Sequence, residues 1–443
     1  MGARVVARLS LARRAALALL GERRRRDARA RDLLRGAGAL DKLDERDRGL
    51  ATRLVLGATA AEGALDAMVD AHLRRGAHLE PRVRDALRLA AYELAYLGTR
   101  SDVAVSQGVE LVRSVAPRAT GLANAVLRRV AEGDVAAVAA ARERVATGDF
   151  DVRDLVIVGA LPEWLAERAL ASLGAGRAAA WACSALEPAA PWAAVSRARR
   201  TEDEALALLA DAGCEPEVGP LPGSARLGAP SRLAPSGLVE RVVAIPCDLA
   251  AQEVALACAP APGERVLEVG QGRGTKTLLL QNAALAAGGP CEVTAVEVSP
   301  RKSELAARRM EVAGVAGHVR CVCADGRALP ADLGAFDLVF LDAPCSGTGT
   351  LARHPEIAWS LEPSAPADLA ALQAELLAAA SAHVAAAGRL VYATCSVLAE
   401  ENEAVVDAFL ASPAGASFSL ERAGLTEVPG GSDTHFHALL RRR

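Results

Sequence analysis

Two cysteines stand directly after apolar segments of the chain, in a pattern suited to nucleophilic chemistry. The segment 336–341 leads into Asp342-Ala343-Pro344-Cys345, and the segment 388–394 leads into Cys395. Such segments are typical of central strands in an α/β sheet, where functional residues gather beyond the carboxyl ends. We therefore expect both thiols to face one crevice, with Asp342 beside them. A thiolate there is suited to attack an electrophilic carbon, and Asp342 is placed to hydrogen-bond a nucleobase.

A buried cysteine is more often a small core side chain than a nucleophile. Here Pro344 fixes the backbone before Cys345, and a second thiol is expected at the end of the adjacent strand. This combination favours catalysis over simple packing for both Cys345 and Cys395.

A glycine loop earlier in the chain joins a buried strand, 265–269, to a helix. Its residues that could approach a ligand are Gly270, Gly272, Gly274 and Lys276. Backbone amides and a helix N-terminus in such a loop can contact a ligand closely. Taken alone, the loop also fits nicotinamide or flavin cofactors, or a tight turn without a ligand.

Acidic residues at the ends of four successive strands narrow the choice of cofactor. They are Glu268, Glu297, Asp325 and Asp342. Glu297 is placed to accept hydrogen bonds from ribose hydroxyls, and Asp325 stands where a contact on the adenine side is expected. The ordered series is typical of enzymes that use S-adenosylmethionine.

The elements that must position these residues divide the chain into three predicted parts. Residues 1–145 have helical periodicity throughout, which predicts an all-α bundle. Residues 146–240 mix helices with short strands and predict a small α+β module, including a helix that begins after Thr201. Residues 241–443 alternate strands and helices, which predicts a doubly wound, Rossmann-like parallel sheet.

Charge is distributed unevenly although the whole chain carries a formal net charge of only -3. Residues 1–36 hold eleven arginines against Glu22, Asp27 and Asp32, a local net charge of 11 − 3 = +8. This basic segment is either a phosphate-binding surface or a solvated, disordered tail.

The cysteine pattern and the hydropathy exclude several classes of protein. The nine cysteines lack the regular spacing of a secreted disulfide scaffold. Cys321 and Cys323 are separated by one residue, which is not a zinc-knuckle spacing, so we expect reduced thiols and no structural metal. No stretch is long and apolar enough to span a membrane, and the apolar segment 9–20 is split by arginines. We expect a cytoplasmic protein.

The motifs around the two cysteines resemble a known family. Residues 342–349 (Asp-Ala-Pro-Cys-Ser-Gly-Thr-Gly), 353–359 (Arg-His-Pro-Glu-Ile-Ala-Trp) and 394–396 (Thr-Cys-Ser) are similar to those of the Nol/Nop/Sun-type RNA cytosine-C5 methyltransferases. In the helical part, residues 43–48, 91–94 and 124–129 resemble the NusB-like domain of the bacterial Sun (RsmB-type) 16S rRNA methyltransferases. The similarity covers nearly the whole chain.

The resemblance implies a multidomain fold and a substrate. It assigns a NusB-like RNA-binding domain to residues 1–145, a ferredoxin/RRM-like domain to 146–240 and a methyltransferase domain to 241–443. S-adenosyl-L-methionine is the implied cofactor and RNA the implied partner, with 16S rRNA favoured over tRNA by the NusB-like domain. We expect a monomer that does not bind membranes.

The resemblance also implies a mechanism. Cys395 would add to C6 of a cytosine, because C5 is otherwise too poor a nucleophile to take a methyl group. Asp342 would stabilise or protonate the ring at N3. Cys345 would assist loss of the C5 proton and release of Cys395, and the target base must leave any stacked structure to reach the pocket.

The chain departs from the family in its first cofactor loop. The family usually has Asp-x-Cys-Ala-Ala-Pro-Gly-Gly-Lys-Thr, whereas residues 268–277 read Glu-Val-Gly-Gln-Gly-Arg-Gly-Thr-Lys-Thr. Lys276 and Thr277 are kept, so we expect cofactor binding with altered contacts to the methionine end. The last strand also differs, since Asp433-Thr434-His435-Phe436 replaces Asp-Gly-Phe-Phe.

Two other functions stay open from the sequence. A DNA cytosine-C5 methyltransferase would also use a Pro-Cys nucleophile, but it would not need the Thr-Cys-Ser motif at Cys395. A non-catalytic RNA-binding or ribosome-assembly factor with a degenerate cofactor loop would not need Cys345, Cys395 and Asp342 together. Measurable affinity for S-adenosylmethionine would separate the second alternative from an enzyme.

Overall fold

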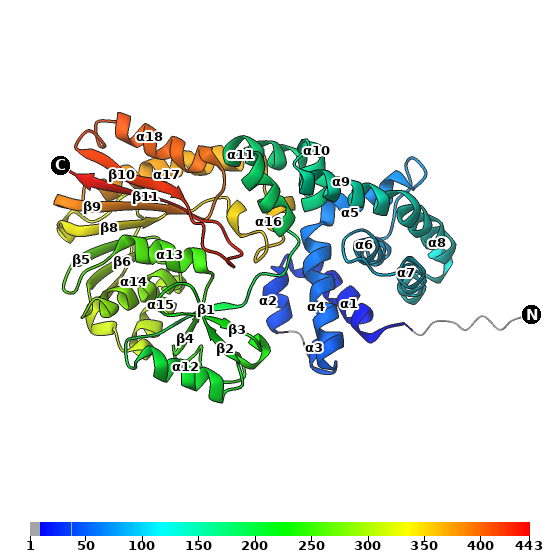
Figure 1. Ribbon diagram of the computed structural model, residues 1–443, viewed down its shortest axis with the longest axis horizontal. Coiled ribbons are helices and arrows are strands. Elements are labelled where there is room, and N and C mark those ends of the chain that lie inside the picture. Colours follow the sequence, from blue (N-terminus) through cyan, green and yellow to red (C-terminus); the bar gives the residue numbers. More distant parts are fainter. Residues whose placement is uncertain (1–8, 37) are drawn as a thin grey trace, which may run out of the picture. The chain divides into compact units, whose positions relative to one another are not determined.

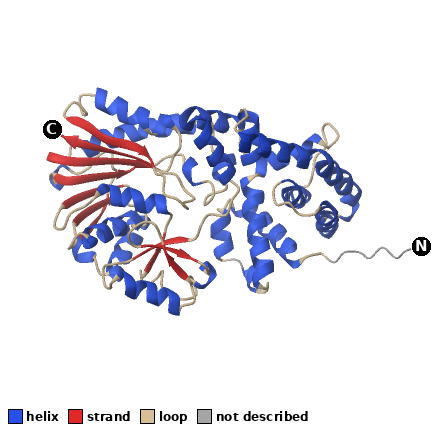
Figure 2. Cartoon of the chain, in the orientation of Figure 1, coloured by secondary structure: helices blue, strands red, loops and turns tan. Residues whose placement is uncertain are grey.

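The computed structural model describes residues 9–36 and 38–443, which fall into two compact units. The helical unit comprises the chain up to Pro188 together with Leu351–Pro363, and the sheet unit comprises Ala189–Thr350 and Ser364–Arg443. Every strand of the described residues belongs to the sheet unit (Figure 2). The predicted fold class is confirmed: helices come first in the chain, followed by a small sheet and a Rossmann-like sheet.

The helical unit is built from amphipathic helices, as the apolar spacing predicts. In chain order they are α1 (Leu11–Arg26), α2 (Ala30–Arg35), α3 (Gly38–Asp41), α4 (Glu45–Ala60), α5 (Glu62–Ala71), α6 (Pro81–Ala95), α7 (Ser101–Val115), α8 (Thr120–Arg129), α9 (Val135–Thr147), α10 (Val152–Gly159) and α11 (Glu163–Ser184). Asp44 caps α4 by accepting a hydrogen bond of 2.7 Å from the backbone N–H of Asp47, and Pro81 stands in the first turn of α6. Buried side chains such as Leu54, Leu87 and Tyr92 form one core.

A segment from late in the sequence completes the helical unit. Leu351–Pro363, which contains the short helix α16 (Ile357–Ser360), packs with helices that come some 200 residues earlier in the chain. The Trp359 Nε1–H donates a hydrogen bond of 3.0 Å to the carbonyl of Ala160. A Cβ atom at Gly63 would lie only 2.2 Å from the Trp359 ring, so glycine is required there for this packing. Arg31 also donates to the carbonyl of Arg353, at 2.5 Å.

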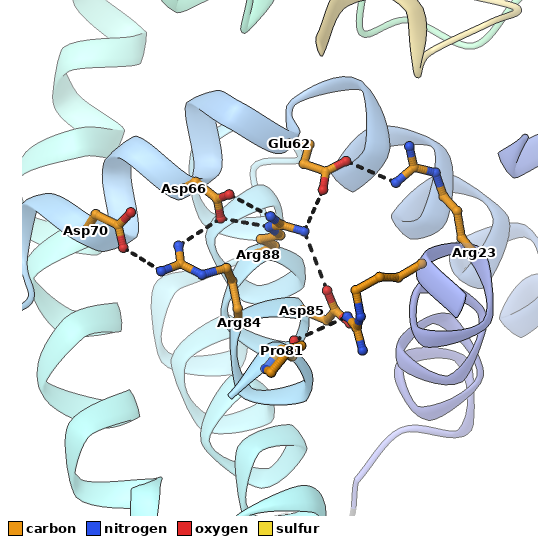
Figure 3. A network of polar contacts seen from close by, with 9 residues as sticks. Arg23, Glu62, Asp66, Asp70, Pro81, Arg84, Asp85 and Arg88 are labelled. Atoms are coloured by element: carbon orange, nitrogen blue, oxygen red, sulfur yellow. Dashed lines mark hydrogen bonds and ion pairs between the residues drawn. The ribbon is translucent and has the colours of Figure 1, made fainter. Parts of the chain in front are cut away.

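Three arginines of the basic N-terminal segment, Arg13, Arg23 and Arg24, pair with acids elsewhere in the same unit. Arg23 pairs with Glu62 at 3.0 Å, and Arg88 bridges Glu62 and Asp66 at 2.7 and 2.5 Å (Figure 3). Arg24 pairs with Asp85, and buried Arg13 with Glu93 at 2.5 Å. For α1 the disordered-tail alternative is therefore wrong, and these arginines stabilise the fold. Residues 1–8, with two further arginines of the basic segment, lie outside the described residues.

The small sheet of the sheet unit is antiparallel, with strand order β2-β3-β1-β4. Its elements are β1 (Trp192–Val195), α12 (Glu202–Asp211), β2 (Pro216–Val218), β3 (Ser224–Leu227) and β4 (Ala244–Pro246). Thr201 caps α12 in a reciprocal capping box with Glu204, as expected for this sequence. The domain boundaries at 145/146 and 240/241, and the RRM-like label, stay predictions. In the structure α10 and α11 belong to the helical unit, and β4 begins after residue 240.

The large sheet has the strand order β10-β11-β9-β8-β5-β6-β7, with β5 to β9 parallel and β10 and β11 antiparallel at one edge (Figure 1). Its strands are β5 (Arg265–Val269), β6 (Glu292–Glu297), β7 (Val319–Cys323), β8 (Phe336–Asp342), β9 (Val384–Thr394), β10 (Phe418–Leu425) and β11 (Phe436–Arg442). From β5 the chain adds β6 and then β7 on one side, and it then returns to place β8 on the other side of β5. Ligands of open α/β sheets bind at such a switch point, outside the carboxyl ends of the strands.

The helices around the large sheet either precede its first strand, as α13 does, or connect its strands. They are α13 (Leu249–Cys258), α14 (Thr275–Ala286), α15 (Pro300–Ala313), α17 (Ala365–Ser381) and α18 (Glu403–Ala411). The sequence pattern predicts a helix over 368–387, which is wrong at its end: α17 ends at Ser381, and β9 already begins at Val384, opposite Phe336 of β8. No helix within residues 9–36 or 38–443 combines the length and the apolar character needed to cross a membrane.

Candidate active site

The structure brings the two predicted catalytic thiols together at the carboxyl ends of β8 and β9. These strands are parallel neighbours, with Asp342 opposite Ala393. Beyond them, the Sγ atoms of Cys345 and Cys395 lie 3.1 Å apart. The backbone N–H of Cys395 also donates to the Cys345 Sγ at 3.2 Å. Both side chains are partly accessible, so a substrate atom can reach the pair.

The Cys345 thiol binds its proton more tightly than an ordinary cysteine does. The pKa of Cys345 is raised well above its ordinary value by its hydrogen bond to Cys395, by burial, and by the negative charge of Glu401. Cys345 therefore keeps its proton near neutral pH.

Lys276 and Asp342 form an ion pair beside the cysteines. The Lys276 Nζ lies 2.8 and 2.7 Å from the two carboxylate oxygens of Asp342. Burial disfavours the ammonium, but Asp342 and the two nearby cysteines outweigh it, so the pKa of Lys276 is raised. The lysine thus holds a fixed positive charge among one carboxylate and two sulfur atoms, where it favours negative charge on a thiol.

The predicted glycine loop follows β5 at the switch point and touches the end of β8. Gly270 has φ 93°, and a Cβ atom there would lie 2.3 Å from the carbonyl oxygen of Asp342. Gly274 has φ 77°, and its Cβ would lie 2.7 Å from Met310. Both positions need glycine, because the positive φ angle disfavours other residues and because a Cβ atom would be too close to its neighbours. Gly272, at φ 58°, faces open space, which leaves its backbone accessible to a ligand.

Glu297 ends β6 and supports the loop. Its Oε2 accepts a hydrogen bond of 2.8 Å from the N–H of Gly272, and its Oε1 accepts one of 2.9 Å from Ser299. A carboxylate can accept about four hydrogen bonds, so Glu297 keeps capacity for the ribose hydroxyls of a bound nucleoside. With the open backbone at Gly272, the loop fits an adenosyl group.

Asp325 follows β7 but is not joined to the other predicted residues by any contact among the described residues. Its carboxylate binds Arg327 at 2.7 Å, and these hydrogen bonds lower the pKa of Asp325 to about 2. Asp325 is partly exposed and negatively charged at neutral pH. A contact with an adenine stays a prediction.

Glu268 lies beneath the loop with no solvent exposure. Its Oε2 accepts a hydrogen bond of 2.6 Å from the Thr277 hydroxyl, whereas its Oε1 has no partner. Burial raises the pKa of Glu268 to about 8. At neutral pH the side chain is therefore mostly protonated, and it supports the loop from below.

Replacing Glu268 with Gln is expected to stabilise the sheet unit more at high pH than at low pH. The folded protein binds this proton more tightly than the unfolded chain, so Glu268 progressively destabilises the fold as pH rises from its ordinary pKa of 4.5 toward 8. The gain for Glu268→Gln should be near zero at pH 4.5 and about 3 kcal/mol at pH 7. Urea unfolding at both pH values measures it, with Glu304→Gln, an exposed carboxylate of α15, as control. An equal gain at both pH values would contradict the assignment.

Sequence reasoning missed a buried carboxylate under the two cysteines. Glu401 is fully buried and accepts hydrogen bonds from Ser346 and Ser396, each of which directly follows a cysteine. Gln373 of α17, also fully buried, donates to Glu401 at 3.1 Å and to the carbonyl of Pro344 at 2.9 Å. The signal in the sequence was the polar run Glu400-Glu401-Asn402-Glu403 shortly after the strand of Cys395.

No group of histidine, cysteine or carboxylate side chains in the described part of the chain could hold a metal ion. The strand order, the glycine loop and the acids at the strand ends together define a Rossmann-like methyltransferase site.

Comparisons with known proteins identify the family. The family model described as 16S rRNA methyltransferase RsmB/F matches residues 255–436, and the NusB family model matches residues 10–132. Ribosomal RNA small subunit methyltransferase B of Thermus thermophilus is 34% identical over 94% of this chain and 94% of its own. The protein of the same name from Salmonella arizonae is 31% identical over 88% and 87%. The chain belongs to the RsmB/F methyltransferase family, and S-adenosyl-L-methionine is its cofactor.

Solved structures show the same fold. The crystal structure of PH0851 has a TM-score of 0.75 at 22% identity and covers 98% of this chain and 99% of that one. NSun6 from Pyrococcus horikoshii has a TM-score of 0.55 at 16% identity, over 63% of this chain and 98% of its own. The likeness to PH0851 thus extends through both units.

Proposed function

We propose that this protein transfers a methyl group from S-adenosyl-L-methionine to C5 of a cytosine in RNA, most specifically 16S rRNA. The observation that carries this proposal is the pair of thiols 3.1 Å apart, next to the Lys276–Asp342 ion pair. A methyltransferase acting on a nucleophilic nitrogen or oxygen needs no thiol, whereas carbon C5 of cytosine must first be activated by addition at C6. The substrate named in the two curated relatives supports small-subunit rRNA.

In the proposed reaction Cys395 acts as a thiolate and forms a covalent bond to C6 of the cytosine. Lys276 supports the thiolate by its positive charge, and Asp342 holds the base through a hydrogen bond. Addition at C6 shifts electron density to C5, where the methyl group supplied by S-adenosyl-L-methionine is added. Loss of the C5 proton then expels the Cys395 thiolate and restores the aromatic ring. We assign the acceptance of the C5 proton to Cys345: once its thiol has lost its own proton to solvent, the raised pKa makes its sulfur a strong base.

The cofactor would lie outside the carboxyl ends of β5 and β6. Gly270, Gly272 and Gly274 allow the backbone to approach it, and Glu297 would bind the ribose. We assign the adenine side to Asp325, and the methionine end to the region of Lys276 and Asp342, with Glu268 supporting the loop from beneath. The buried, unpartnered Oε1 of Glu268 and the open space at Gly272 support this arrangement.

A basic cluster in the helical unit supports RNA as the substrate. His354 is half-buried, and burial together with the charges of Arg29, Arg31 and Arg353 lowers the pKa of His354 to about 4. The charges of three arginines thus act on an uncharged imidazole. We assign this cluster to the RNA backbone, because closely spaced arginines bind phosphates well.

Replacing Arg29 with Gln is expected to weaken RNA binding about three- to tenfold at moderate salt. Loss of one phosphate contact should also reduce the slope of log K against log salt concentration by about 0.7 to 0.9. Titration of RNA at several salt concentrations measures both quantities. Arg35→Gln is the matched control, because Arg35 is the exposed last residue of α2, the helix that Arg29 precedes, and it pairs with Asp32 at 3.2 Å. If both variants bind alike, the cluster does not contact phosphates.

The test of the proposal is methyl transfer to unmodified small-subunit rRNA, unmodified tRNA and a DNA of the same sequence. The expected product is 5-methylcytosine at one position of the rRNA, found by sequencing the methylated RNA. Activity on tRNA alone would select that substrate instead. RNA binding without methyl transfer and without cofactor affinity would make the protein a ribosome-assembly factor. For an rRNA substrate we expect a monomeric enzyme working in the cytoplasm.

A further inference from the structure

The loop that carries Cys345 has almost no regular structure of its own. It spans residues 343–350 between β8 and the start of Leu351–Pro363, with only a short 3₁₀ turn at Thr348–Thr350. Its cysteine must nevertheless stay within reach of Cys395, which ends a different strand. Hydrogen bonds between the two cysteine segments and to neighbouring groups must therefore hold them in register; the Gly349 N–H, for example, donates to the carbonyl of Cys395 at 2.8 Å.

The side chain of Glu401 contacts both segments at the residues next to the cysteines. Its Oε1 accepts a hydrogen bond of 2.8 Å from the backbone N–H of Ser346. Its Oε2 accepts one of 2.6 Å from the hydroxyl of Ser396 and another from the hydroxyl of Ser346. The two hydroxyls also lie 3.2 Å from one another. One carboxylate thus joins the residue after Cys345 to the residue after Cys395.

Neighbouring groups hold Glu401 itself in place. Its backbone carbonyl accepts a hydrogen bond of 2.6 Å from the Tyr392 hydroxyl, and Gln373 donates to its Oε1. Asn402 donates to the carbonyl of Ser396 at 2.9 Å and accepts from the Thr394 hydroxyl at 2.5 Å. It thus binds the residues on both sides of Cys395. All these side chains are buried. A network of satisfied buried hydrogen bonds is rigid and specifies a single arrangement.

Given the proposed function, we infer that Glu401 is a positioning residue for catalysis: it fixes the Cys345 and Cys395 thiols in their mutual geometry and makes their environments unequal. Glu401 touches neither sulfur atom directly and acts through Ser346 and Ser396. Its negative charge also lies near Cys345 and favours the protonated form of that thiol. Such groups matter because a displacement of about 1 Å in an active site can cost about 10²-fold in rate.

The first test is Glu401→Gln, which keeps the size of the side chain but removes its charge and one acceptor. We expect kcat to fall about 10²-fold, with KM for RNA and affinity for S-adenosylmethionine changed less than about threefold. Glu403→Gln, an exposed carboxylate two residues away, is the matched control and should keep wild-type kcat. Two outcomes would overturn the inference. One is a Glu401→Gln variant that keeps wild-type kcat, and the other is a loss of activity that only matches the fraction of the variant that is unfolded.

The second test needs no RNA and so does not depend on the proposed function. Iodoacetamide labelling followed by mass spectrometry measures the relative reactivity of Cys345 and Cys395. In wild-type protein Cys395 should react several-fold faster, and Glu401→Gln should reduce this preference severalfold. Ser346→Ala and Ser396→Ala should each reduce it in part, and should add little in the Glu401→Gln background, because the three groups act as a unit. Unchanged reactivity in all three single variants would contradict the positioning role, even if methyl transfer were absent from the wild type.

Discussion

Cys345→Ala protein is expected to accumulate a covalent adduct with its RNA substrate that survives denaturation, whereas Cys395→Ala protein should form none. The reason is the division of roles between two thiols whose Sγ atoms lie 3.1 Å apart. Cys345 keeps its proton because Cys395, burial and Glu401 all raise its pKa. The bond to C6 would then be made by Cys395, and without Cys345 the methylated base is not released.

Gel mobility under denaturing conditions, with radiolabelled S-adenosylmethionine, measures the adduct. Turnover should fall at least about 10³-fold in both variants, the scale expected for loss of a catalytic nucleophile or its partner. The double variant should form no adduct, and Cys258→Ala, which removes a buried thiol far from solvent, serves as control. An adduct in Cys395→Ala but not in Cys345→Ala would reverse the assignment of the two cysteines.

The ends of the strands that carry the site could be predicted, because an apolar segment stops there at an acidic residue or a cysteine. The apolar run of β8 ends at Asp342, and that of β9 ends one residue before Cys395, as expected. The start of β9 could not be predicted, since the alanines at 385–387 have high helix propensity. Their strand conformation depends on pairing with β8, where Phe336 lies opposite Val384.

Long-range contacts account for what the sequence could not indicate. Glu401 meets Ser346, which lies 55 residues away, so its role follows from packing and not from local pattern. In the same way, the sequence predicts that the motif with His354 and Trp359 belongs to the methyltransferase domain. In the structure it packs with the helical unit, through the hydrogen bond from Trp359 to Ala160, 199 residues away. Only tertiary structure reveals either association.

The basic N-terminal segment shows the same limit for charge. Its net charge of 11 − 3 = +8 pointed to phosphate binding. Yet Arg13, Arg23 and Arg24 pair with acids from α5 and α6. The formal charge of a segment does not show which acidic side chains its arginines contact in the folded protein. Arg29 is exposed, and its charge lowers the pKa of His354, so we assign the proposed contact with RNA to Arg29.

Asp342→Asn is expected to lower methyl transfer by about 10² to 10⁴-fold, the range for loss of a group that directs proton transfer or binds the reacting base. The change removes the charge that both neutralises Lys276 and raises its pKa, and it leaves a partly buried ammonium without its counter-charge. Rates with saturating RNA and cofactor should fall, and Lys276→Met combined with Asp342→Asn should cost little more than either change alone, because the pair acts as a unit. Asp337→Asn, an exposed residue at the other end of β8, is the control. Activity of Asp342→Asn within tenfold of wild type would show that this ion pair only supports the fold. Strictly additive losses in the double variant would show that Asp342 and Lys276 act independently.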